Sequence, residues 1–433
     1  MLKILSIKEL NFYSSWQYGW AKIKILSSFD KYMSIFWLLG PFIYLIERDP
    51  ADLWLSLIGL TFLIRSFIKK DWAWSKQIWF KFAFLFWVSS IISACLSYDP
   101  IFSLSQGVPW IRFPLYAAAA QAWLARDRDI RIIMLIAVIV GLLMMNIILL
   151  SEIMIEPKLR LTWPYGDTIP GVYIAKLGLL TLCTLLLINL KNNNILVSFF
   201  IGASVIILAL TGERTHLLIV ICALFTCSFF YKPNIVRYLI FSLILVFLIS
   251  LISYAKPETF KRIFEDSYHS ISNVGTYNKT NEPSYNWTYW GAWRGGIQQG
   301  LDLPLFGVGP SGTRNTCELL DETEYKWLPG KNYCGNHPHN FYIQMFAETG
   351  IIGLIFGTMM FFSITRFCYK ERKKNINCPM ASIAFIIPLG LFFPIQQFGS
   401  FFGQWGNLFI WFAIGMAISQ FQIFKKRREV NYD

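Results

Sequence analysis

Long apolar stretches separated by short polar loops recur along the whole chain. Twelve of them have the roughly 20 largely apolar residues that a helix needs to cross a bilayer core. Their centres are Leu38, Leu60, Val88, Ala118, Val140, Leu179, Ile206, Leu224, Ile244, Ile355, Ile387 and Ala413. The pattern predicts an all-α integral membrane protein with about twelve transmembrane helices.

Composition agrees with this prediction, since 55% of the 433 residues are hydrophobic and only 15% are charged. Such a chain does not have the composition of a water-soluble surface. The amphipathic segment 1–30 lacks the apolar run and small-residue cleavage site of a signal peptide. We therefore expect no part of it to be removed.

The net charge of +13 would suggest a nucleic-acid partner in a soluble protein. Sorting the loops alternately gives one side with 25 basic and eight acidic residues, and another with 14 basic and 18 acidic residues. Basic loops stay in the cytoplasm, so the excess is a topology signal. It predicts cytoplasmic termini and no nucleic-acid partner.

This sidedness places one long loop outside, between the ninth and tenth spans. It holds a short amphipathic helix in Pro257 to Ser270 and a polar linker in Ile271 to Asn286. A second helix follows in Trp287 to Leu301 and ends at a Pro/Gly turn in 303–310. The predicted division is a cytoplasmic segment 1–30, spans one to nine in 31–254, an external domain 255–338, spans ten to twelve in 339–424 and a basic tail 425–433.

Two of the eight cysteines, Cys317 and Cys334, lie in the external domain. In an oxidising compartment they most simply form a disulfide, worth roughly 3 kcal/mol by loop closure. Two free thiols are the alternative.

Ionisable groups in or beside spans are candidates for function because they are costly there. Arg214 lies in a tight external turn between the seventh and eighth spans, and Lys176 lies within the sixth, about 12 Å below the external surface. Either side chain can instead snorkel to lipid phosphate, and both interpretations stay open.

The densest polar group lies where the external domain re-enters the membrane, in Asn336 to Gly353. His339 and Asn340 stand at the expected start of the tenth span, where free backbone N–H groups suit an anion, and an imidazole suits proton transfer. His337 is two residues away and is an alternative base. Glu348 falls on the opposite face to His339, so it is either a polar contact between helices or a catalytic group.

Together these residues resemble the bacterial O-antigen ligases and, more broadly, the O-antigen ligase/polymerase superfamily. The motif His-Asn/Ser, nine residues, Gly-x-x-Gly is met by His339, Asn340, Gly350 and Gly353. The motif Arg-x-x-x-Leu is met by Arg214 and Leu218. A third essential Arg before a Pro-Leu/Phe-Gly turn is met by Arg294, ahead of Pro304-Leu-Phe-Gly.

The resemblance implies a glycosyltransferase with a GT-C-like architecture in the inner membrane of a Gram-negative bacterium. Such an enzyme transfers a glycan from undecaprenyl diphosphate to a sugar hydroxyl of lipid A–core at the periplasmic face, with inversion and without a metal or other cofactor. His339 would be the base, and Arg214 and Arg294 would hold the diphosphate. We also predict substrate-binding roles for Asn340, Lys176 and His337.

Other functions compete with this one. An O-antigen polymerase, or a ligase acting on protein, would use the same donor and a similar site. A twelve-span transporter is the rival from another class, but the chain shows no matching halves, and the loop between the sixth and seventh spans is only Lys191-Asn-Asn-Asn.

Overall fold

The computed structural model describes residues 12–125, 128–156, 158–188, 194–230, 235–272, 285–321, 324, 327, 332–374, 378–394 and 399–421. These residues form helices and no strand. Every centre predicted for a span lies in a helix. Residues 273–284 of the predicted linker Ile271 to Asn286 lie outside the described residues, as does the basic tail 425–433, whereas the ends of the linker belong to α14 and α15.

The α-helices are α1 (Phe12–Lys24), α2 (Ser28–Leu38), α3 (Gly40–Ile43), α4 (Arg48–Lys69), α5 (Ile78–Cys95), α6 (Pro100–Gly107), α7 (Arg112–Trp123), α8 (Arg128–Ile155), α9 (Ile169–Val172), α10 (Leu179–Leu187), α11 (Asn194–Leu210), α12 (Arg214–Phe230), α13 (Ile235–Ala255), α14 (Pro257–Ser272), α15 (Tyr285–Asp302), α16 (Thr313–Thr316), α17 (Phe341–Arg372), α18 (Pro379–Ile383), α19 (Ile386–Leu391) and α20 (Gln404–Ile418). Short 3-10 turns are η1 (Ala73–Lys76), η2 (Val108–Ile111) and η4 (Cys317–Leu319), and η3 (Tyr173–Leu177) is a π-helical turn.

Several of these helices suit a membrane. Among the described residues α4, α5, α8 and α17 are each long and apolar enough to cross one, and the number rises from four to six if two bent helix pairs each count as one span. In one pair the continuous stretch of α9 and η3 meets α10 at a bend of 48°, and in the other α13 meets α14 at 114°. Four further apolar helices are shorter, so twelve spans stay a prediction.

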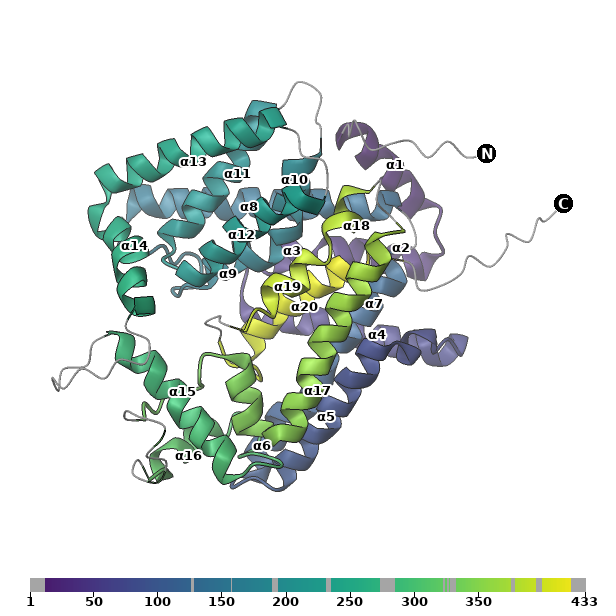
Figure 1. Ribbon diagram of the computed structural model, residues 1–433. Helices are drawn as coiled ribbons and strands as arrows, with labels where there is room; N and C mark the ends of the chain where they lie inside the picture. The colour runs from purple at the N-terminus through teal and green to yellow at the C-terminus, as the bar shows by residue number, and fades with distance from the viewer. Residues whose placement is uncertain are drawn as a thin grey trace.

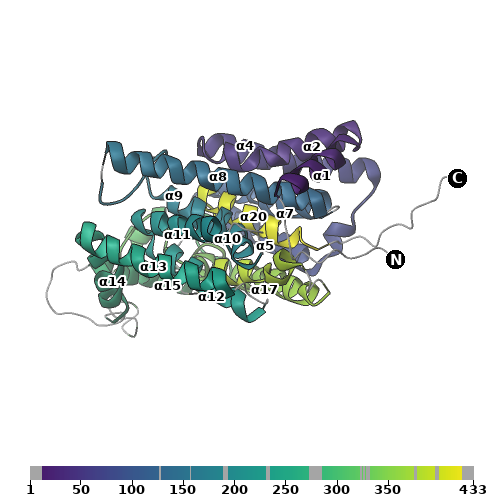
Figure 2. The ribbon, with the colours of Figure 1, turned by 90° about the horizontal axis from the view of Figure 1, so that it is seen from above.

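The helices pack in two neighbouring groups (Figure 1). In one, α17 runs along α5, with α4, α7 and α20 beside them. In the other, α11 packs against α12 and α13, and α14 turns away from the end of α13. Seen from above, α4 and α8 lie along one edge of the molecule, and α12 and α17 lie along the opposite edge (Figure 2).

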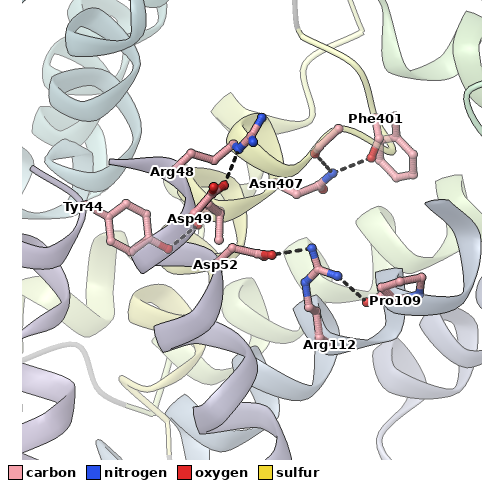
Figure 3. Close-up of polar contacts among 10 residues, drawn as sticks. Tyr44, Arg48, Asp49, Asp52, Pro109, Arg112, Phe401 and Asn407 are labelled. Atoms are coloured by element: carbon pink, nitrogen blue, oxygen red, sulfur yellow. Dashed lines mark hydrogen bonds and ion pairs between the residues drawn. The ribbon is translucent and has the colours of Figure 1, made fainter. Parts of the chain in front are cut away.

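Buried polar contacts fix the first group at one end of α4 and α7. Arg112 forms an ion pair with Asp52 at 2.8 Å, and it also donates to the carbonyl oxygen of Pro109 at 3.3 Å (Figure 3). The side chains of this pair are 17% and 20% exposed, so each charge needs its partner. Asn407, in the first turn of α20, ties this helix to the backbone of Phe401 and Gly403.

Candidate functional site

The helix that follows the two histidines is broken in its third turn. Gly350 has φ 64° and ψ −167°, so α17 divides into a segment 341–349 and a longer apolar helix. A Cβ at Gly350 would lie 2.3 Å from the carbonyl carbon of Leu305. The Pro/Gly turn after α15 fills this break, since Ile351 N donates to Pro304 O at 2.8 Å and Val308 N donates to Ala347 O at 2.9 Å.

A Gly-x-x-Gly spacing within an apolar run is typical of close packing between helices. The role of Gly350 is instead to adopt a backbone conformation that side chains disfavour, and to admit the backbone of another loop. Gly353 does lie at a helix contact, because a Cβ there would approach the Ser89 hydroxyl of α5 at 3.5 Å.

His339 and Asn340 immediately precede α17. Asn340 is the N-cap, and its Oδ1 accepts from the N–H groups of Tyr342 at 2.9 Å and Ile343 at 3.3 Å. Two of the N–H groups expected to be free are therefore satisfied. His339 has a left-handed φ of 56°, which is uncommon outside glycine, and its ring centroid lies 4.2 Å from that of His337.

Arg294 is fully covered, with 1% exposure, in the middle of α15. Its Nη1 donates to Gln298 Oε1 at 3.2 Å and to Asn332 Oδ1. Asn332 Nδ2 in turn donates to Gln298 at 3.0 Å. Two neutral amides thus contact the guanidinium.

The loop that supplies Asn332 is closed by the predicted disulfide, Cys317–Cys334, which is confirmed. Cys317 also lies against α15, because a Cβ at Gly295 would be 3.4 Å from its Sγ. A Cβ at Gly296 would be 2.7 Å from Pro338, so α15 touches the segment with the histidines. The structure therefore brings Arg294 in α15 close to the segment that holds His337 and His339.

Arg214 opens α12, directly after the turn at its N-terminal end. Its Nη1 donates to the carbonyl oxygen of Arg262 in α14 at 3.4 Å. The preceding residue, Glu213, pairs with Arg160 at 3.2 Å and with His216 at 2.9 Å. Arg160 also donates to Thr211 O at 3.2 Å, so the turn is fixed against the loop before α9.

The electrostatics of Glu213 follow from these contacts. Burial alone would raise the pKa of its carboxyl, but the hydrogen bonds and charges of His216, Thr168 and Arg160 lower the pKa to about 2. Glu213 is therefore a fixed negative charge beside Arg214.

Lys176 lies in the π-helical turn η3 and is 2% exposed. Because the side chain is covered, it does not snorkel to the membrane surface. Its charge interacts with Glu213 and His216. Lys176 therefore belongs to the cluster around the turn that precedes Arg214.

A small apolar hollow lies beside the helix that Arg214 opens. It is lined by side chains of α11, α12, α13 and α14, namely Val205, Ile206, Ala209, Leu217, Ile221, Leu245, Ile249, Ile252, Phe260, Ile263 and Phe264. Arg214 contacts the backbone of α14 next to Ile263, so a cationic group and an apolar hollow are neighbours.

The site residues thus form two groups. Arg294, His337, His339 and Asn340 lie around α15 and the start of α17, whereas Arg214 and Lys176 lie around α12 and η3. Sequence reasoning missed the residues that hold the cations, above all Asn332, Glu213 and Arg160. For Glu213 the available signal was its place beside Arg214 in a tight turn.

No three His, Cys, Asp or Glu side chains in the described part of the chain are grouped so that they could hold a metal ion. That the reaction needs no metal stays a prediction.

In the described part of the chain, these features define an all-helical protein with apolar helices suited to a membrane and with cationic and imidazole groups around α12, α15 and the start of α17. A family model described as O-antigen ligase matches residues 196–357. The match supports membership of the chain in the O-antigen ligase/polymerase superfamily and indicates a glycosyltransferase-like enzyme. It includes every predicted site residue except Lys176. No curated protein matches the chain significantly.

Proposed function

We propose that the chain is an O-antigen ligase, which transfers a glycan from undecaprenyl diphosphate to a sugar hydroxyl of lipid A–core. The reaction takes place at the periplasmic face of the inner membrane of a Gram-negative bacterium. Twelve spans and cytoplasmic termini belong to this proposal. The observation that carries it is Arg214, a cation next to an apolar hollow within a segment that matches the ligase family.

The donor joins an anionic diphosphate to a long apolar chain. Arg214 and the hollow have the matching chemistry, because a guanidinium fork binds phosphate oxygens and an all-apolar lining accepts part of a hydrocarbon chain. Lys176 is buried in η3, close enough to the same turn to interact with Glu213 and His216. The fixed Glu213 limits the net charge of this group and holds the turn in place.

The transfer requires a base and a stabilised leaving group. The acceptor oxygen attacks the anomeric carbon while the bond from that carbon to the diphosphate oxygen breaks. His339 accepts the hydroxyl proton as the new C–O bond forms, and Arg214 and Arg294 offset the charge on the departing diphosphate. Asn340 and His337 lie beside the base and would contact the sugars.

The proposal is tested by replacing each residue in cells that make O-antigen. His339→Ala, Arg214→Ala and Arg294→Ala should each abolish long chains on lipid A–core while full-length polymer stays on the carrier lipid. Arg48→Ala is the control, since Arg48 is a half-exposed Arg paired with Asp49 at 2.9 Å and lies outside the site. Wild-type chain ladders from stably inserted variants would refute the assignment of those residues.

Deletion of the gene separates the ligase from its relatives. A missing polymerase would leave lipid A–core with a single repeat, whereas a missing ligase leaves polymer on the carrier lipid. Uptake of a labelled solute that survives His339→Ala would favour a transporter.

A further inference from the structure

The carboxyl group of Glu348 takes no part in the reaction proposed above, yet it is completely buried, with 0% exposure. Its Oε1 accepts from Thr313 Oγ1 at 2.7 Å and from Gln344 Nε2 at 3.0 Å. Its backbone oxygen accepts from Ser93 in α5 at 2.6 Å and from Gly309 N at 3.0 Å. Glu348 is thus bonded to three other parts of the fold.

Gln344 lies on the same face of segment 341–349, and the N-cap Asn340 precedes it at the same helical spacing. Gln344 donates to Ser400 Oγ at 3.0 Å and accepts from Phe401 N at 2.7 Å. Asn340 donates to Pro394 O at 2.8 Å. Asn340, Gln344 and Glu348 form one polar stripe that begins beside His339.

The segment needs these bonds because the break at Gly350 separates it from the long part of α17. Nine residues at 1.5 Å each make a rod of about 13 Å, so a tilt of about 5° at Glu348 moves its other end by about 1 Å. A displacement of about 1 Å in a reacting group can cost about 100-fold in rate.

The bonds of Glu348 also lead to the helix that carries Arg294. The carbonyl oxygen of Thr313 accepts from Gln299 Nε2 at 3.1 Å, and Gln299 is five residues after Arg294 in α15. A continuous set of hydrogen bonds therefore joins the helix that follows His339 to the helix that carries the cation.

We propose that Glu348 is a positioning residue, which sets the orientation of His339 relative to Arg294 through its hydrogen bonds to Thr313 and Gln344. This inference rests on the proposed function for the role of His339. Glu348 acts through the polar stripe and does not touch the reacting atoms.

The test compares Glu348→Gln with Glu348→Ala in the purified full chain in lipid nanodiscs, with donor and acceptor lipids. Gln keeps an acceptor oxygen for Thr313, so its kcat should stay close to wild type. Ala removes the bond, and kcat should fall about 100-fold, with a much smaller change in KM for the donor. Thr313→Val removes the hydroxyl that donates to Glu348, so it should also lower kcat. Thr313→Ser keeps a hydroxyl, so its kcat should stay close to wild type.

Asn146→Ala is the matched control, because Asn146 is also buried and bonds across helices, to Ser204 at 2.8 Å. It should lower thermal stability but leave kcat unchanged at a permissive temperature. A Glu348→Gln variant as inactive as Glu348→Ala would overturn the proposal, since the charge itself would then be needed. So would wild-type kcat in Glu348→Ala.

A second readout does not depend on glycosyl transfer. The rate at which diethylpyrocarbonate modifies His339, followed by mass spectrometry, should rise several-fold in Glu348→Ala and stay at the wild-type value in Glu348→Gln. Equal rates in all variants would refute positioning even if the chain is a ligase. Different rates in a chain without transferase activity would refute the proposed function and leave the positioning role.

Discussion

Replacement of Gly350 by Ala perturbs the break that separates the segment after His339 from the rest of α17. The backbone there has φ 64° and ψ −167°, a region that is essentially reserved for glycine. The added Cβ would lie 2.3 Å from both the carbon and the oxygen of the Leu305 carbonyl and 2.5 Å from Phe306 N. All three are backbone atoms, so no side chain can rotate away to make room.

The expected loss has three sources. The backbone conformation costs a non-glycine residue about 1–3 kcal/mol. Overpacking costs about 1–3 kcal/mol more. If the turn moves away, the bonds from Ile351 N to Pro304 O and from Val308 N to Ala347 O are lost, at about 1 kcal/mol each. We therefore expect Gly350→Ala to reduce the free energy of unfolding by about 2–6 kcal/mol.

Variants at two other glycines distinguish backbone strain from overpacking when their thermal melting is measured on detergent-solubilised protein. Gly166 has φ 74° but nothing within 4 Å of a Cβ, so Gly166→Ala should lose only about 1 kcal/mol from backbone strain. Gly399 has neither restriction, and Gly399→Ala should melt like wild type. The reasoning is refuted if Gly350→Ala melts within error of Gly399→Ala.

Two further predictions concern the groups that hold the cations. The double variant Cys317→Ser, Cys334→Ser should release Asn332 from Arg294 and raise KM for the donor, together with a loss of roughly 3 kcal/mol in stability. Cys222→Ser is the control, since Cys222 is free and exposed. An unchanged donor KM in the double variant would show that Arg294 does not need the closed loop. The pKa of Glu213 is lowered from 4.5 to about 2, so its ionised form stabilises the folded chain above pH 4.5, and this stabilisation is lost as the pH falls toward 2. The melting temperature of Glu213→Gln should therefore change less than that of wild type across this pH window. Parallel curves of melting temperature against pH would contradict the ionised state assigned to Glu213.

Much of the helical framework follows from the sequence, because apolar runs and turn residues act locally. The boundaries of α14 and α15 lie within a few residues of those predicted, since Pro257 starts one helix and the Pro/Gly turn ends the other. The disulfide was predictable because only two cysteines belong to the external domain. The number of spans was less accessible, since several apolar runs form helices shorter than a membrane requires.

The break at Gly350 could not be predicted in the same way. Its Gly-x-x-Gly spacing within an apolar run is typical of helix packing, and no local pattern shows that another loop enters there. The partners of Arg294 were hidden for a related reason. Asn332 is 38 residues away in the chain, and only the closed loop brings it to α15. Contacts between distant segments decide both features.

Different sets of residues hold the two arginines in place. Arg214 is fixed by the turn that Glu213 and Arg160 secure, next to an apolar hollow. Arg294 is fixed by the amides of Gln298 and Asn332, and its helix α15 contacts the segment of His339. Under the proposed function, a diphosphate held by both arginines would connect α12 to α15.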